Sequence, residues 1–203
     1  MEKIDLVIAS RNKKKIEELK RLLADLPIVV RAVDEIADVP EVVEDEPTFK
    51  ANAIKKAVEV AKATGLMALA DDSGLEVEYL NGEPGVYSSR YAGIPRDDQR
   101  NNEKLLRKMQ DVPWEKRDAW FKCVIALATP DGEVETCEGK CVGKIGYQPK
   151  GELGFGYDPI FVLPEYDKTL AEIDADLKNE ISHRAKALAQ VKKVLAEKIQ
   201  KMG

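Results

Sequence analysis

Two neighbouring aspartates carry the strongest hint of chemistry in this sequence. Asp71 and Asp72 follow an apolar run in "LMALADDSGLEV" and precede Ser73 and Gly74. If the predicted strand breaks at Ala70, both carboxylates can converge on one point, where the glycine would relieve a tight backbone. Such oxygen ligands suit Mg²⁺, which takes one or two carboxylates together with substrate phosphates. The alternative is an Asp-rich turn in solvent.

A basic segment could hold the matching anion. "SRNKKK", Ser10 to Lys15, joins a predicted strand to a predicted helix, where backbone N–H groups and the helix dipole favour negative charge. Ser10 and Asn12 supply short polar side chains, and Lys15 supplies a positive charge. An ordinary capped helix with a basic first turn is the alternative, and the glycine-rich loop of a Walker motif is missing. The aspartates would then bind a metal ion, and this segment would bind a phosphate that the same metal ion contacts.

Three more polar residues lie near the second predicted helix. Glu44, in the acidic connection before it, could add a third carboxylate to the metal site. Asn52 and Lys56 are four residues apart and share a helix face. They could reach a phosphate, but a solvated stripe is the simpler interpretation.

Two segments near the end of the chain could read a nucleobase. "GFGYDP" places Phe155, Tyr157 and Asp158 among glycines, so that an aromatic ring could stack on a base while free backbone N–H groups read its edge. An aromatic-anchored turn is the alternative. "ISHR" offers His183 and Arg184 as hydrogen-bond donors, although a lone histidine is more often structural.

The elements that must position these residues follow from apolar periodicity and caps. Strands alternate with helices early in the chain and a β-hairpin comes late, which predicts an α/β fold with a mixed sheet. We expect Thr48 to cap the second helix, Gly65 to end it, and Thr169 to open a later helix with the capping box "TLAE". The predicted strands span 3–10, 28–36 and 66–70, the hairpin spans 119–145, and the first three helices span 11–26, 48–65 and 96–112.

Length and charge limit the classes of function. At 203 residues the chain can form one sizeable core or one domain with two lobes. With 32 Lys and Arg against 37 Asp and Glu, the net charge of −5 predicts no nucleic-acid partner and no anionic-membrane partner. No apolar run could span a bilayer, and the N-terminus lacks a secretory signal. The three cysteines favour reduced structural residues of a cytoplasmic protein over a zinc site.

Together these motifs resemble the inosine triphosphate pyrophosphatase family, also called the Ham1 family. The likeness runs nearly end to end through "SRNKKK", "TFKANAIKKA", "ADDSGLEV", "PGVYSSRYAG", "GFGYDPIF" and "ISHRAKAL". One departure is "EDEPTF", where the family commonly has Thr-Gly before the Thr-Phe pair. The resemblance implies that residues 1–203 form a single Ham1-like domain, an elongated mixed β-sheet flanked by helices, with two lobes and a substrate cleft between them. It also implies a homodimer.

The resemblance further implies Mg²⁺-dependent hydrolysis of inosine, deoxyinosine and xanthosine triphosphates to the monophosphate and pyrophosphate. Asp72 would accept a proton from water, assisted by Asp71 and Lys15, and Glu44 and Asp72 would hold the metal. The expected substrate-binding residues are Ser10, Arg11, Asn12, Lys13, Lys14, Lys15, Asn52, Lys56, Ser73, Phe155, Gly156, Tyr157, Asp158, Lys178, His183 and Arg184.

Hydrogen-bond donors near the base could select among purines. Donors from the backbone near Phe155 to Asp158, or from His183 and Arg184, would pair with a 6-keto oxygen and reject adenine. Exclusion of guanine would need a second feature. One rival is a related pyrophosphatase for modified pyrimidine nucleotides, whose phosphate chemistry would look the same. The other is a nucleotide-binding regulator without turnover, against which the paired aspartates argue.

Overall fold

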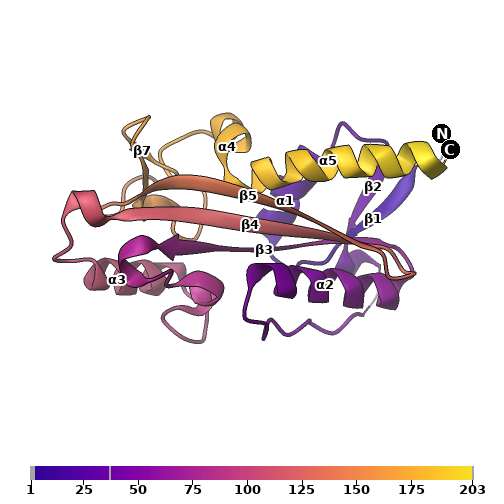
Figure 1. The fold of residues 1–203 in the computed structure, drawn as a ribbon, viewed down its shortest axis with the longest axis horizontal. Coiled ribbons are helices and arrows are strands. Elements are labelled where there is room, and N and C mark those ends of the chain that lie inside the picture. The colour runs from indigo at the N-terminus through magenta and orange to yellow at the C-terminus, as the bar shows by residue number, and fades with distance from the viewer. Residues whose placement is uncertain (1–2, 37, 203) are drawn as a thin grey trace. The chain divides into compact units, whose positions relative to one another are not determined.

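The computed structural model describes residues 3–36 and 38–202, which divide into two compact units. Unit 1 comprises Met1–Asp72, Cys123–Gly139 and Arg184–Gly203, and unit 2 comprises Ser73–Lys122 and Lys140–His183. The helices and strands in chain order (Figure 1) are β1 (Ile4–Ile8), α1 (Lys13–Leu22), β2 (Ile28–Ala32), α2 (Phe49–Thr64), β3 (Met67–Val77), α3 (Asp98–Lys108), β4 (Asp118–Ala128), β5 (Val134–Ile145), β6 (Phe161–Leu163), β7 (Lys168–Thr169), α4 (Ala175–Ile181) and α5 (His183–Met202).

One mixed sheet contains the strands in the order β2-β1-β3-β4-β5-β6-β7. β1 pairs in parallel with β2 and with β3, and helices α1 and α2 make the connections that parallel pairing requires. β6 pairs antiparallel with both β5 and β7. The predicted α/β fold with a mixed sheet and a late hairpin is confirmed.

The apolar core of unit 1 lies against its strands. In Figure 1, α5 and α2 lie on opposite sides of these strands. The side of α1 and α5 contributes large aliphatic residues, whereas α2 contributes mainly alanines. As predicted, Thr48 caps α2 by accepting a hydrogen bond from the Ala51 N–H at 3.1 Å, and Gly65 ends it at φ 69°. The core cluster includes Leu6, Ile8, Leu19, Leu23, Leu69, Ile125, Leu188, Val191 and Leu195.

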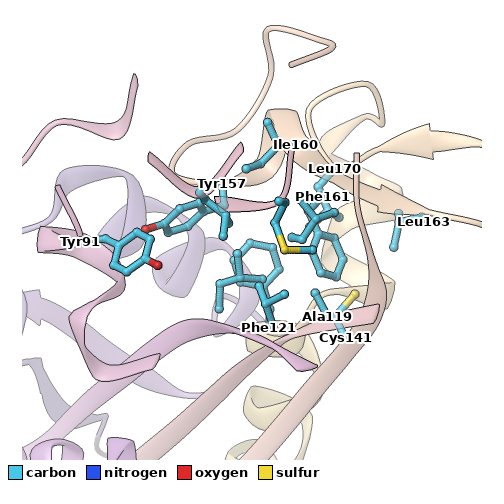
Figure 2. Packing of buried hydrophobic residues seen from close by; sticks show 14 of the residues in the cluster. Tyr91, Ala119, Phe121, Cys141, Tyr157, Ile160, Phe161, Leu163 and Leu170 are labelled. Carbon is cyan, nitrogen blue, oxygen red and sulfur yellow. The ribbon is translucent and has the colours of Figure 1, made fainter. Parts of the chain in front are cut away.

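The separate core of unit 2 packs aromatic rings among aliphatic side chains (Figure 2). Phe121 of β4 and Phe161 of β6 pack with ring centroids 4.6 Å apart. Figure 2 also shows Tyr91 beside Tyr157, both buried and drawn with their hydroxyl oxygens. Since Tyr157 belongs to the predicted base-binding loop, this core anchors that loop.

Strand β3 does not break at Ala70, and this expectation is wrong. The strand runs unbroken from Met67 through both aspartates to Val77. Every second residue of a strand points to the same face, which places Asp71 on the face that carries Leu69 and Leu75 into the apolar cores. The strand can continue because buried cations accompany Asp71, as described below.

The capping box predicted at Thr169 does not open a helix. Thr169 ends β7, pairs with β6, and donates its hydroxyl to the Lys150 carbonyl at 2.7 Å. Its N–H does donate to the Glu172 carboxylate at 2.8 Å, but the helix begins only at Ala175, after the cap Asp174. Strand pairing therefore overrides the local pattern.

The three cysteines are free and buried. Among the described residues, every helix is too short or too polar to cross a bilayer.

Arg117, in unit 2, is a buried cation surrounded by backbone carbonyls. It is only 1% exposed, and its guanidinium donates to four carbonyl oxygens. Two belong to the C-terminal end of α3 and the residues after it, Met109 and Val112, at 2.5 and 2.9 Å. The others are Ile145 and Gly146, where β5 ends, at 2.6 and 2.8 Å. The side chain therefore fastens α3 to β5.

We predict that Arg117→Met lowers the free energy of unfolding by roughly 3 kcal/mol or more, because four carbonyls would lose their donors. Arg117→Lys should lose less, since an ammonium still provides three donors. Urea titrations followed by circular dichroism would measure both. Equal stability of Arg117→Met and the wild type would contradict a structural role for this side chain.

Candidate functional site

A series of four charged side chains, of which Asp71 and Arg184 are buried and Lys15 and Glu18 half-buried, connects three elements of unit 1. Lys15 of α1 lies 3.0 Å from an Asp71 carboxylate oxygen, and the Arg184 Nε of α5 lies 3.4 Å from the same oxygen. The other end of the guanidinium contacts Glu18 of α1 at 2.6 Å. Lys15 and Glu18 are three residues apart, so one face of α1 supplies both ends of the series.

The start of α1 aims Lys15 at this cluster. Asn12 caps the helix by accepting a hydrogen bond from the Lys15 N–H at 3.2 Å, and the Ser10 hydroxyl accepts one from the Asn12 N–H at 3.2 Å. Arg11 contacts the Asp34 carboxylate at 3.0 Å and donates to the Val39 carbonyl. Lys13 and Lys14 are exposed in the first turn. The capped helix with a basic first turn, which was the alternative interpretation, is therefore present. Anion binding by Ser10 to Lys15 stays a prediction.

The pKa of Asp71 lies well below its ordinary range. Burial alone would raise it, but the positive charges of Lys15, Arg184 and Lys56 outweigh burial. The pKa of Arg184 is raised in turn, because Asp71 and Glu18 outweigh its own burial. Asp71 is therefore a permanent anion whose charge is already compensated.

Asp72 has the opposite pKa shift although it is the next residue. It is 8% exposed, and burial raises its pKa to about 6 against the lowering effect of Lys56. The negative charges of Glu44 and Asp71 raise the pKa further. This carboxylate can therefore take up and release a proton near neutral pH.

Lys56 connects the acidic residues. Its ammonium donates to the Glu44 carboxylate and to the Asp71 backbone carbonyl, both at 2.7 Å. The buried Asn52 amide accepts from the Glu46 N–H at 3.0 Å and donates to the Glu46 carbonyl at 3.4 Å. Both side chains are buried, so the solvated stripe is wrong. α2 instead fixes the acidic connection that carries Glu44.

The donor set fits one divalent cation that substrate would complete. Among the side chains described, no group of three or more histidines, cysteines or acids is arranged around a common metal position. Glu44 and Asp72 nevertheless interact, since the charge of Glu44 raises the pKa of Asp72. A cation held by both carboxylates would relieve that repulsion. Two carboxylate oxygens with remaining positions for phosphate suit Mg²⁺.

In unit 2, the loop of Gly154 to Asp158 is folded around the Asp158 carboxylate. One oxygen of this carboxylate accepts hydrogen bonds from the Phe155 N–H at 3.0 Å and from the Lys178 ammonium at 2.7 Å. The same ammonium lies 4.9 Å from the centre of the Phe155 ring. A Cβ at Gly154 would stand 2.1 Å from that carboxylate, so only glycine fits there. The loop holds the ring in a defined place.

The expectation of free backbone N–H groups in this loop is wrong for three residues. Phe155 donates to Asp158 as described, Gly156 donates to the Asp98 carboxylate at 2.8 Å, and the Asp158 N–H donates to the Phe155 carbonyl at 3.2 Å. The buried Tyr157 donates its hydroxyl to the Ser88 carbonyl at 2.7 Å. Side chains are therefore better placed than these amides to read a base.

The remaining predicted residues lie in both units. His183, 6% exposed, stacks on Phe121 of unit 2 with ring centroids 4.9 Å apart and an interplanar angle of 15°. Ser73 is half-buried in β3. Arg184 contacts the two carboxylates of unit 1, so its assignment to the base stays a prediction.

The predicted site residues divide between the two units. Unit 1 contains Ser10, Arg11, Asn12, Lys13, Lys14, Lys15, Glu44, Asn52, Lys56, Asp71, Asp72 and Arg184, and unit 2 contains Ser73, Phe155, Gly156, Tyr157, Asp158, Lys178 and His183.

Sequence reasoning missed several partners of these residues. Glu18 could have been found, because its spacing from Lys15 places it on the same face of α1. Asp98 and Asn102 share one face of α3 in the same way, but nothing in their spacing indicates a distant loop as their partner. The Ser88 carbonyl carries no side-chain signal.

Comparison with known proteins covers nearly the whole chain. The model of the Ham1 family matches residues 6–194. A dITP/XTP pyrophosphatase of Desulforamulus reducens is 53% identical over 190 residues, which cover 94% of each chain. One of Bacillus subtilis is 47% identical over 191 residues, covering 94% of this chain and 96% of that protein. A HAM1 protein structure from Coxiella burnetii superposes with a TM-score of 0.88 at 45% identity, covering 96% of this chain and 99% of that one.

The opposite pKa shifts predict opposite effects of two neighbouring substitutions. The pKa of Asp72 is about 6 in the fold against an ordinary 3.8. Its ionisation therefore begins to destabilise the fold above pH ~4 and does so fully above pH ~6, by at most about 3 kcal/mol. With a metal chelator present, Asp72→Asn should raise the unfolding midpoint at pH 8 and lose this advantage towards pH 4.

The matched variant is Asp71→Asn, which should lower stability by roughly 3 kcal/mol or more at pH 8, because Lys15 and Arg184 would lose their shared anion. Thermal unfolding across this pH range would measure both effects. Shifts of the same sign for the two variants at pH 8 would show that the neighbours do not occupy different electrostatic environments.

Proposed function

This chain belongs to the Ham1 family, and from that premise we propose that it hydrolyses the triphosphates of inosine, deoxyinosine and xanthosine to the monophosphate and pyrophosphate. The observation that carries the proposal is the pair of adjacent carboxylates with opposite pKa shifts beside two lysines. The relatives named dITP/XTP pyrophosphatase support the choice of substrate.

The triphosphate binds at the start of α1 in this proposal. The first-turn N–H groups and Lys13, Lys14 and Lys15 provide positive potential there. Lys15 is held by Asp71 and can stabilise the charge that develops on the departing pyrophosphate. Because the Lys15 ammonium is already fixed before substrate binds, it needs little reorganisation during the reaction.

Glu44 and Asp72 would hold Mg²⁺, the ion that the resemblance and the donor set favour. When bound, the ion would neutralise phosphate charge and act as a Lewis acid. Lys56 keeps the Glu44 carboxylate in place, and Asn52 fixes the backbone two residues further on. In this proposal Asn52 therefore positions the site rather than contacting phosphate.

Asp72, not Asp71, accepts the proton of the attacking water. Burial raises the pKa of Asp72 to about 6 without a metal ion. A bound Mg²⁺ would lower that pKa, so the carboxylate would be ionised at neutral pH and able to accept a proton. Asp71 is unsuited because two cations share its charge and its pKa is strongly lowered. Its role is to hold Lys15 and Arg184.

Side chains of unit 2 recognise the base. The Phe155 ring can stack on a purine, and its position is fixed by Lys178 and Asp158. Lys178 and His183 are the candidate donors to a 6-keto oxygen, because three loop N–H groups are already engaged. Adenine would present a donor to those donors and be rejected.

We further propose that the chain acts as a single domain in the cytoplasm, as a homodimer. The family match from residue 6 to 194 includes parts of both units, which supports one functional domain. The three free, buried cysteines agree with a reducing compartment. Light scattering coupled to size-exclusion chromatography would determine the oligomeric state.

We predict that incubation with inosine triphosphate and Mg²⁺ yields inosine monophosphate and pyrophosphate in one step. In ¹⁸O-labelled water, the label should enter the monophosphate, because water attacks the α-phosphorus. Phosphorus NMR and mass spectrometry would identify the products. Inosine diphosphate with orthophosphate would refute the proposal, and faster turnover of modified pyrimidine triphosphates would favour the related pyrimidine enzyme.

We also predict that Asp72→Asn lowers kcat at least about 100-fold while the fold persists, because the base is lost. Lys15→Ala should raise KM and lower kcat, since Lys15 would contact phosphate in both the ground and transition states. Lys20→Ala is the matched control on α1, because Lys20 forms an ion pair with the exposed Glu35 at 3.1 Å and not with Asp71 or Glu44. Near-normal turnover by Asp72→Asn at saturating Mg²⁺ would exclude Asp72 as the base.

A further inference from the structure

One face of α3 holds both polar backbone groups of Gly156. The Asp98 carboxylate accepts a hydrogen bond from the Gly156 N–H at 2.8 Å. The Asn102 amide donates to the Gly156 carbonyl at 3.0 Å. Asp98 and Asn102 are four residues apart, so successive turns of α3 place an acceptor and a donor side by side. The pair is complementary to this single residue.

The backbone conformation of Gly156 makes these two hydrogen bonds possible. Its φ is +63°, in the left-handed region, and a Cβ there would meet no heavy atom within 4 Å. The glycine is therefore suited by its conformation and not by lack of space. That conformation directs the N–H and the carbonyl of the residue after Phe155 towards α3.

Helix α3 is itself fixed to the segment that holds the other side of the loop. Asn101, 2% exposed, donates to the Ser89 carbonyl at 3.1 Å and accepts from the Ala92 N–H at 2.7 Å. Tyr157 donates to the adjacent Ser88 carbonyl. Within unit 2, Asn101 thus joins α3 to residues 89 and 92, whereas Asp98 and Asn102 join α3 to the loop of Gly154 to Asp158.

We propose that Asp98 and Asn102 are positioning residues for base recognition, acting through Gly156 on the Phe155 ring and the Asp158 carboxylate. The inference rests on the function proposed above, in which this loop recognises the purine. Asn102 carries most of the effect, because it is 7% exposed whereas Asp98 is exposed. Neither side chain belongs to the carboxylate and lysine cluster of unit 1.

Loss of the Asn102 amide should impair recognition of the base without impairing the chemistry at the phosphates. With Asn102→Ala, the Gly156 carbonyl loses its donor and the ring loses its fixed orientation. We expect kcat/KM for inosine triphosphate to fall about tenfold, mainly through KM. Slow hydrolysis of adenosine triphosphate should be nearly unchanged, so the inosine-to-adenosine ratio of kcat/KM should fall by a similar factor.

Matched variants on α3 distinguish positioning from general loosening. Asn101→Ala removes a buried amide of the same kind from the neighbouring residue and should lower the unfolding midpoint comparably, but it should keep the substrate ratio. Asp98→Asn retains an acceptor oxygen and should keep the ratio better than Asp98→Ala. An unchanged ratio in Asn102→Ala, or an equal fall in Asn101→Ala, would overturn the proposal.

Amide hydrogen exchange measures the loop without relying on turnover. The Gly156 amide should exchange at least about tenfold faster in Asn102→Ala than in Asn101→Ala, and equal rates would overturn the proposal. If the wild type hydrolysed no purine triphosphate with Mg²⁺, the proposed function and the base-recognition role would both fall. The exchange rates would then still decide whether α3 holds the loop, so the two failures can be distinguished.

Discussion

The burial of one carboxylate organises unit 1. Asp71 is 1% exposed, and a charge in that position would be strongly destabilising without Lys15 and Arg184. These partners come from α1 and α5, the first and the last helix of the chain. Both helices must therefore pack on β3 before the charge is compensated. The apolar cluster of the same helices supports this arrangement, so hydrophobic packing and charge neutralisation select the same fold.

The proposed site obtains two different carboxylates from consecutive residues of a strand. A loop could give both aspartates similar surroundings, whereas the alternation of β3 separates them. Asp71 shares its charge with two cations, while Asp72 lies beside Glu44 and Lys56. The loop of Gly154 to Asp158 is also held in place by its neighbours. Asp158 and α3 fix its backbone, so that the Phe155 ring is left to make contacts. Both groups are preorganised by hydrogen bonds that exist before any ligand binds.

The sequence predicted features governed by local signals and missed those governed by distant partners. Thr48 and Gly65 were correctly predicted because caps depend on neighbouring residues. Continuation of β3 through two aspartates could not be foreseen, since the compensating Arg184 lies 113 residues away. The contact between Asn102 and Gly156 spans 54 residues and lacks a motif. At Thr169, a correct local pattern was overridden by pairing with β6.

The continuity of β3 also constrains how this protein can evolve. Met67, Leu69, Asp71, Leu75 and Val77 share one parity along the strand, and the four apolar residues among them are buried in the two cores. A single-residue insertion within the strand would reverse the parity of everything after it, so that either the aspartates or a core would change faces. Length variation must therefore accumulate elsewhere, for example in the exposed turn at 130–133 between β4 and β5. The faces on which Asp71 and Asp72 lie are therefore fixed by the same alternation that places the apolar residues of β3 in the cores.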